Sequence, residues 1–324
     1  MITHDNTLID SDHIQFMRDL QIGLSKEVKQ IPSKYFYDKK GSDLFNAITR
    51  HQDYYLTQCE LDILIQNKKM LSDIFAGNHF NLIELGPGEG IKTKIIIDQL
   101  MKDNSSFTYI PIDISKKYLD YLSNDFLQIF PELRFHGIEA DWLDGLKSNR
   151  ITSSNKNIIL FLGSSIGNFT PEASLQFLSN IALSLNHGGY MLIGFDLCKD
   201  THIIHRAYDD SAGITRSFNL NLLDRINNEL GGDFNLNQFE HQPRYNFAID
   251  AMESFLVSKI KQVVNIRRMN LSFTFNENEI IHVESSYKYR PKQIEKLAQL
   301  TGFNVIKNFH DTKNYFLCSL WKVR

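Results

Sequence analysis

The sequence lacks long hydrophobic runs and any large excess of one charge sign. Its longest uninterrupted apolar segment is the five residues 158–162, far short of the roughly 20 that cross a bilayer. The 35 basic and 38 acidic side chains give a formal net charge of −3, which argues against a nucleic-acid binder with a basic face. The first residues lack the basic-then-apolar build of a signal peptide. We therefore expect a cytoplasmic protein that binds neither membranes nor nucleic acid.

Cysteine is also scarce. Cys59, Cys198 and Cys318 are an odd number, at spacings that match neither a zinc motif nor a disulfide framework. His202 and His205 could share one face of a helix, but no carboxylate on that face completes a metal site. We expect reduced structural thiols and no metal.

At 324 residues the chain is long enough for about two globular units. From residue 80 onward, short apolar strands alternate with amphipathic helices. Strands are expected at residues 80–85, 107–112, 157–162 and 190–197, and helices at 92–100, 118–130 and 175–185. This alternation, with glycine-containing turns after strands, predicts a doubly wound α/β domain with a parallel sheet.

The flanking segments have other patterns. Residues 12–75 are expected to form helices, punctuated by Pro32 and Gly41, and residues 200–250 a helical insertion. The final segments are expected to be antiparallel strands at 251–264, 267–276 and 280–287, a helix at 291–301, and a hairpin of 303–309 with 315–321. We expect a discontinuous α/β domain of residues 60–198 and 287–324, and a second α+β domain of residues 1–59 and 199–286.

A glycine-rich turn, Glu84-Leu-Gly86-Pro-Gly88-Glu-Gly90, joins the first strand to the first helix. Glycines there let the backbone approach a ligand, and the helix N-terminus offers free amide donors. The dinucleotide fingerprint needs a third glycine at position 91, where this chain has Ile91. The run instead resembles the E-x-G-x-G-x-G motif of class I S-adenosylmethionine (SAM)-dependent methyltransferases.

Two acidic positions strengthen this interpretation. Asp113 ends the second strand about 20 residues after the glycine turn, where a carboxylate can hold a ribose diol. The alternative is that Asp113 caps the following helix, although Ser115 is available as the cap. Asp141 stands beside Trp142, and this pair could contact the amino group and the face of an adenine ring.

Several longer blocks go beyond a generic methyltransferase. They are residues 34–45, 53–57, 163–169, 207–215, 218–230 and 284–289. From about residue 30 to the C-terminus the chain resembles the histidine-specific methyltransferase family, whose best-known members trimethylate the α-amino group of L-histidine to hercynine for ergothioneine biosynthesis. The resemblance implies a class I SAM-methyltransferase fold, SAM as the methyl donor, and an amino acid as the small-molecule substrate of a monomeric enzyme.

The resemblance also assigns residues to the cofactor site. The implied SAM-binding residues are Tyr37, Gly86, Pro87, Gly88, Lys92, Asp113, Asp141 and Trp142. Pro87 replaces a serine that is usual in the family, which removes a hydroxyl but keeps the turn. The α/β domain is accordingly the expected SAM-binding domain, and the second domain the expected substrate-binding domain.

A second implied set surrounds the acceptor. The implied substrate-binding residues are Tyr54, Gly163, Asn168, Tyr208, Ser254, Glu284 and Ser286. Asn168 and Tyr208 would hold the carboxylate, and Glu284 and Ser286 the imidazole. Tyr37 and Tyr54 are the implied catalytic residues, contacting the amine and helping its proton leave; with Phe45 they could stabilise the growing cation.

One departure from the family concerns specificity. Ala251 and Ser254 stand where histidine-modifying members carry arginine and methionine, and that methionine helps enclose the substrate side chain. Another amino acid or amine is therefore an alternative acceptor. The sequence also leaves open an NAD-dependent oxidoreductase, which Ile91 disfavours, and a methyltransferase-like binding protein without catalysis.

Overall fold

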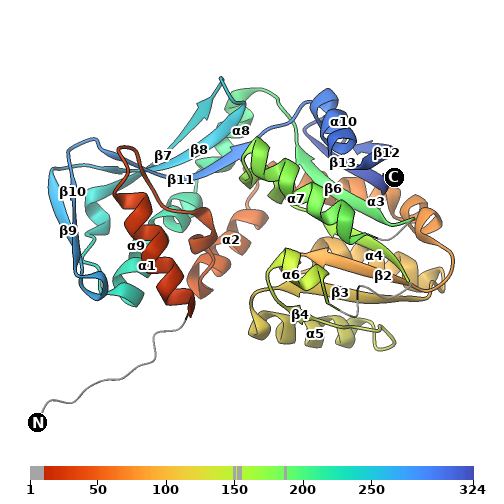
Figure 1. Ribbon diagram of the computed structural model, residues 1–324. Helices are drawn as coiled ribbons and strands as arrows, with labels where there is room; N and C mark the ends of the chain where they lie inside the picture. Colours follow the sequence, from red (N-terminus) through yellow and green to blue (C-terminus); the bar gives the residue numbers. More distant parts are fainter. Residues whose placement is uncertain (1–10, 149–150, 152–154, 186–187) are drawn as a thin grey trace, which may run out of the picture. The chain divides into compact units, whose positions relative to one another are not determined.

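The chain forms two compact units, each assembled from segments that are distant in sequence. The computed structural model describes residues 11–148, 151, 155–185 and 188–324 (Figure 1). Unit 1 comprises Met1–Tyr54 and Asp200–Ser286, and unit 2 comprises Tyr55–Lys199 and Tyr287–Arg324. The chain therefore passes from one unit to the other three times. No helix in the described part of the chain is long and apolar enough to span a membrane.

Unit 2 is built on a seven-stranded sheet with the order β12-β13-β6-β5-β2-β3-β4. Its strands are β2 (Phe80–Leu85), β3 (Phe107–Asp113), β4 (Ile138–Glu139), β5 (Lys156–Phe161), β6 (Tyr190–Asp196), β12 (Phe303–His310) and β13 (Phe316–Val323). The pairings among β2 to β6 are parallel, whereas β13 is antiparallel to both β6 and β12. A dinucleotide-binding sheet would instead continue beyond its fifth strand with another parallel strand.

Helices cover both faces of this sheet. They are α3 (Tyr55–Phe75), α4 (Ile91–Lys102), α5 (Lys116–Ile129), α6 (Trp142–Leu146), α7 (Pro171–Ser184) and α10 (Pro291–Leu300). On one face Ile83 belongs to the core that also contains Leu178 of α7 and Ile294 of α10. On the other face the ring of Tyr109 stacks on Phe126 of α5, with 5.1 Å between centroids. Neighbouring residues of a strand point to opposite faces of the sheet, and helices pack against both of these faces. The predicted doubly wound fold is confirmed.

The unit 2 elements follow the sequence pattern closely. The strand expected at 80–85 and the hairpin near the C-terminus are confirmed, and the expected helices agree to within a few residues. Strand β4 and helix α6 were not predicted, since a two-residue strand and a five-residue helix are too short to show a period. Helix α3 begins unit 2 at Tyr55, whereas the boundary was expected at residue 60.

Unit 1 packs helices against a four-stranded sheet with the order β1-β11-β8-β7 and a separate β9-β10 ribbon. Its helices are α1 (Ser11–Leu24), η1 (Ser33–Phe36), α2 (Lys39–Arg50), α8 (Thr201–Tyr208), α9 (Ile214–Leu230), η3 (Leu236–Gln238) and η4 (Arg267–Met269). Its strands are β1 (Lys29–Gln30), β7 (Phe239–Asn246), β8 (Ala251–Ser258), β9 (Gln262–Ile266), β10 (Leu271–Phe275) and β11 (Ile280–Tyr287). Ile226 of α9 shares a core with Leu256 and Ile281 of the sheet, so α9 is the central helix of this unit.

Four expectations for unit 1 are corrected. The single strand expected at 251–264 is two strands, β8 and β9, and the segment expected as a strand from residue 267 begins with η4. Strand β7 was not predicted, because the region 200–250 was interpreted as helical. Gly41 does not interrupt a helix: it lies in the first turn of α2.

Gly41 is required by the close approach of two backbone segments. A Cβ added there would lie 1.7 Å from the carbonyl oxygen of Phe36, so the η1–α2 connection must move to accept a side chain. We expect Gly41→Ala to destabilise the protein by about 2 kcal/mol or more, measured by urea unfolding. Asp43→Ala, an exposed change in the same helix, is the control and should cost much less. Equal midpoints for the two variants would contradict this account.

Candidate cofactor and substrate sites

The glycine-rich turn lies between the end of β2 and the start of α4. Gly86, Gly88 and Gly90 have φ values of +66°, +52° and +65°, the left-handed region that side chains rarely adopt. A Cβ at Gly86 would approach the ring of Trp142 to 3.1 Å, whereas a Cβ at Gly88 would meet nothing within 4 Å. The backbone of the turn is therefore accessible at Gly88, and the indole ring of Trp142 lies beside the turn at Gly86.

The first turn of α4 is open to a ligand. Its N-cap is Gly90, which has no side chain to accept a hydrogen bond from the helix amides. Amides at a helix N-terminus carry partial positive charge and need acceptors. This helix end can therefore bind a carboxylate or another polar group placed over the glycine turn.

Asp113 emerges at the same sheet edge as the glycine turn. Leu85 pairs with Ile112 in the parallel register, so the next residues, Gly86 and Asp113, leave neighbouring strands side by side. The Asp113 carboxylate accepts a hydrogen bond from the Ser115 amide at 2.9 Å, and burial raises its pKa above the ordinary value. The N-cap of α5 is Ser115, as predicted, and not Asp113. The predicted role of Asp113 toward a ribose diol stays a prediction.

Asp141 and Trp142 occupy the start of α6. Asp141 is exposed and caps the helix by accepting from the Leu143 amide at 3.1 Å. The Trp142 ring packs against Phe161, with 5.2 Å between centroids, and lies beside Gly86. The structure thus brings the predicted aromatic ring to the glycine turn. The predicted role of Asp141 toward an adenine amino group stays a prediction.

Glu84 of the glycine motif is a buried structural carboxyl. It accepts hydrogen bonds from the hydroxyls of Thr93 and Tyr109, each at 2.5 Å. Burial is the main cause that raises its pKa to about 7. Because Thr93 belongs to α4 and Tyr109 to β3, Glu84 ties together the three elements that shape the turn.

A second buried carboxylate, Glu60 of α3, was not predicted. It accepts from Lys92 Nζ at 2.6 Å and from the Gly163 amide at 2.8 Å. The structure thereby joins Lys92, predicted to bind SAM, to Gly163, predicted to bind the substrate. A sequence signal existed, since Glu60 lies at helical spacing from the buried Leu56 and Leu64.

The unit 1 candidates include an aromatic cluster. The ring centroid of Phe45 is 5.6 Å from that of Tyr37 and 6.4 Å from that of Tyr54. The phenol of Tyr37 has a raised pKa, through burial of its hydroxyl end and then through the negative charge of Glu284, although 40% of the residue is exposed. Tyr37 therefore keeps its proton at neutral pH and can donate a hydrogen bond.

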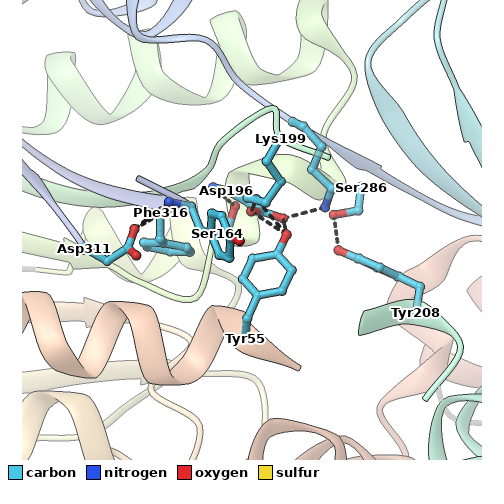
Figure 2. Close-up of polar contacts among 10 residues, drawn as sticks. Tyr55, Ser164, Asp196, Lys199, Tyr208, Ser286, Asp311 and Phe316 are labelled. Carbon is cyan, nitrogen blue, oxygen red and sulfur yellow. Dashed lines mark hydrogen bonds and ion pairs between the residues drawn. The ribbon is translucent and has the colours of Figure 1, made fainter. Parts of the chain in front are cut away.

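A hydrogen-bonded pair stands near this cluster in unit 1. The buried hydroxyl of Tyr208 donates to Ser286 Oγ at 2.7 Å (Figure 2). Ser286 and Glu284 belong to β11, whose alternation of buried residues changes phase after Val283. Simple alternation along this strand therefore does not describe how its last residues are oriented.

The remaining candidates are separate from these groups. Asn168 is exposed at the end of η2 (Ser165–Asn168), five residues after Gly163. Ser254 is 1% exposed in the middle of β8, opposite Pro243 of β7. Tyr37 belongs to unit 1, whereas the other residues predicted to bind SAM belong to unit 2.

Comparison with known proteins decides the family. Residues 16–323 match the family described as "Histidine-specific methyltransferase, SAM-dependent". The chain belongs to this family. It is a SAM-dependent N-methyltransferase with SAM as its cofactor, and this membership rejects both the NAD-dependent oxidoreductase and the non-catalytic binding protein.

Relatives match over nearly the whole chain. A protein of Mycobacterium tuberculosis named histidine N-alpha-methyltransferase is 33% identical over 96% of this chain and 96% of its own length. One of Mycolicibacterium smegmatis with the same name is 35% identical over 88% of each chain. Ergothioneine biosynthesis protein 1 of Schizosaccharomyces pombe is 28% identical over 87% of this chain and 37% of its own length.

The buried carboxyl of Glu84 predicts a pH dependence of this methyltransferase's stability. Between its ordinary pKa of 4.5 and the folded value of about 7, the folded state binds more protons than the unfolded state, so stability falls as pH rises through this window. As the pH rises through this window, the unfolding free energy of the wild-type protein should fall by up to about 3 kcal/mol relative to that of Glu84→Gln.

Urea unfolding of both proteins from pH 4.5 to 8 measures this difference. Groups other than Glu84 titrate in both proteins and cancel. Asp144→Asn, at a largely exposed carboxylate in unit 2, should show a nearly pH-independent difference from the wild type. A flat difference for Glu84→Gln would contradict the shifted pKa.

Proposed function

We propose that this enzyme transfers methyl groups from SAM to the α-amino group of L-histidine, forming hercynine for ergothioneine biosynthesis. The family and the names of the relatives support this acceptor. The observation that carries it is the polar group of unit 1, in which Tyr208 bonds Ser286 and Glu284 acts electrostatically on Tyr37. These donors and acceptors suit a carboxylate, an imidazole and an amine.

The two units have different roles in this proposal. Unit 2 binds SAM, and unit 1 carries most of the groups that hold the amino acid. The acceptor is a small molecule, and one chain contains every residue that the reaction is proposed to use.

The glycine turn provides the SAM site. The open backbone at Gly88 admits the ligand, and the uncapped start of α4 receives its carboxylate. Asp113 binds the ribose, and Trp142 packs on the adenine side. Pro87 removes one amide donor from this turn but leaves those of α4. When bound, SAM supplies an electrophilic methyl group on a sulfonium.

Asn168 and Tyr208 are proposed to bind the carboxylate of histidine. A phenol has one proton, which Tyr208 donates to Ser286 in the structure. If Tyr208 turns this proton to the substrate carboxylate, Ser286 can donate its own proton to the phenol oxygen in return. Glu284 is then placed to accept the imidazole N–H.

The amine must lose a proton before it can attack. Tyr37 is proposed to contact the amine, directly or through water, and to help its proton leave, as expected from the sequence. Tyr54 remains a candidate for guiding the proton to solvent. The rings of Tyr37, Phe45 and Tyr54 offer faces to the cation formed by repeated methylation. Holding the reactants in line can contribute on the order of 7 kcal/mol.

A second candidate acceptor is another amino acid or amine. Ser254 is buried, and the family resemblance implies methionine at its position and arginine at that of Ala251 in histidine-modifying members. The smaller side chain leaves more volume beside the substrate, or room for water.

A methyl-acceptor screen tests the choice. The purified enzyme is incubated with SAM and each common amino acid, and mono-, di- and trimethyl products are resolved by mass spectrometry. We expect L-histidine to give the highest kcat/KM and the trimethyl product. A higher kcat/KM for a different amino acid would replace histidine as the acceptor.

Replacing the Tyr208 hydroxyl tests the carboxylate site. A hydrogen bond to a charged group contributes about 1.5–3 kcal/mol, so Tyr208→Phe should lower kcat/KM for the amino acid by roughly 10- to 100-fold. Steady-state kinetics with saturating SAM measure this. The matched control is Tyr35→Phe, which removes a hydroxyl bonded to Asp19 at 2.7 Å from an equally buried tyrosine of unit 1. Similar kinetics for the two variants would remove Tyr208 from the site.

A further inference from the structure

The Asp196 carboxylate, at the end of β6, is the centre of a buried ionic cluster (Figure 2). The Tyr55 hydroxyl donates to its two oxygens at 2.8 and 2.9 Å, and Lys288 Nζ lies 2.8 Å from Oδ2. Lys199 donates to Asp196 as well, and to the Tyr55 oxygen at 2.7 Å. The side chains of Asp196 and Lys288 have no exposed surface. We refer to Asp196, Tyr55, Lys199 and Lys288 as the Asp196 junction.

The three partners of Asp196 mark the three places where the chain enters or leaves unit 2. Tyr55 is the first residue of unit 2 after residue 54, Lys199 is the last before residue 200, and Lys288 is the second after residue 286. One carboxylate thus holds the unit 2 end of every connection between the units. This convergence involves contacts within unit 2 alone.

The charges of the junction are costly to bury. Burial by itself would raise the pKa of Asp196, but Lys288 and Lys199 outweigh it and hold that pKa below the ordinary value. Burial lowers the pKa of Lys199. Buried ion pairs often contribute less stability than apolar residues of the same volume would. A gain in stability is therefore a weak explanation for this buried cluster. A stronger explanation is that the cluster holds the connected segments in one geometry.

Asp196 also holds the loop that follows β5. Its backbone amide donates to Ser164 Oγ at 2.8 Å. Ser164 has a left-handed φ of +58° and directly precedes η2, which ends at Asn168. The same residue therefore fixes both the three connections and the segment that carries Gly163 and Asn168.

We propose that Asp196 is a positioning residue for the amino-acid substrate. Three of the proposed substrate residues lie within two positions of a residue that the junction holds: Tyr54 precedes Tyr55, Gly163 precedes Ser164, and Ser286 is two residues before Lys288. Consecutive Cα atoms are 3.80 Å apart, so fixing one residue limits its neighbour closely. This inference rests on the proposed function. The residues proposed to bind SAM follow β2, β3 and β4, which do not adjoin β6.

The test removes one hydroxyl from the junction. Tyr55→Phe keeps the ring and loses the donor to Asp196. We expect KM for the amino acid to rise about tenfold, with the Kd for SAM, measured by calorimetry, within about twofold of the wild-type value. Tyr190→Phe, the same change at the opposite end of β6, is the control and should leave both constants unchanged. A purely structural role for Tyr55 would shift both constants or neither, and either result would overturn the proposal.

Removing the charge is the stronger variant. Asp196→Asn keeps the shape but leaves two buried lysines without a counterion, so we expect a larger loss of kcat/KM than with Tyr55→Phe. If this variant does not fold, Tyr55→Phe alone decides.

Hydrogen exchange separates this proposal from the choice of substrate. By mass spectrometry, Tyr55→Phe should speed amide exchange in residues 51–55, 163–168 and 284–288 relative to Tyr190→Phe, whatever the acceptor is. Failure of the wild type to methylate histidine would refute the proposed acceptor only. Unchanged exchange in these segments would overturn the junction's role.

Discussion

The parallel register of β2 with its neighbours is the constraint on which the unit 2 site depends. β2 pairs with β3 on one side and β5 on the other, and all three strands end at the same sheet edge. Gly86, Asp113 and the loop at Gly163 therefore leave the sheet close to one another. A one-residue slip of any strand would reverse its side chains and separate these groups. The continuous burial of β2 on both faces makes such a slip costly.

Three buried carboxyl groups stabilise the loops at this edge, and each is neutralised differently. Glu84 receives two hydroxyl donors and holds its proton to about pH 7. Glu60 has one lysine and one backbone amide as partners, and Asp196 has two lysines and a phenol. A buried acid with fixed donors tolerates few arrangements of its surroundings. Loops held in this way lose little further entropy when a ligand binds.

Sequence reasoning recovered the features that depend on local pattern. The doubly wound sheet, the glycine turn and Ser115 as a helix cap all follow from periodicity and short motifs. It missed β7, because residues 200–250 were interpreted as a helical insertion and the strand's polar residues and proline hide its alternation. It also missed the roles of Glu60 and Asp196, because each meets a partner far along the chain: Gly163 is 103 residues from Glu60, and Tyr55 is 141 residues from Asp196. Residue type alone does not show which distant groups a buried acid will meet.

The place of β13 has a consequence for synthesis on the ribosome. This strand is the last of the chain, yet it lies between β6 and β12 in the sheet. Until residues 316–323 have left the exit tunnel, β6 has an unpaired edge, and its apolar run remains open to pairing with other nascent chains. A premature stop codon near the C-terminus would therefore leave this edge open permanently, although it would spare every residue assigned to ligand binding.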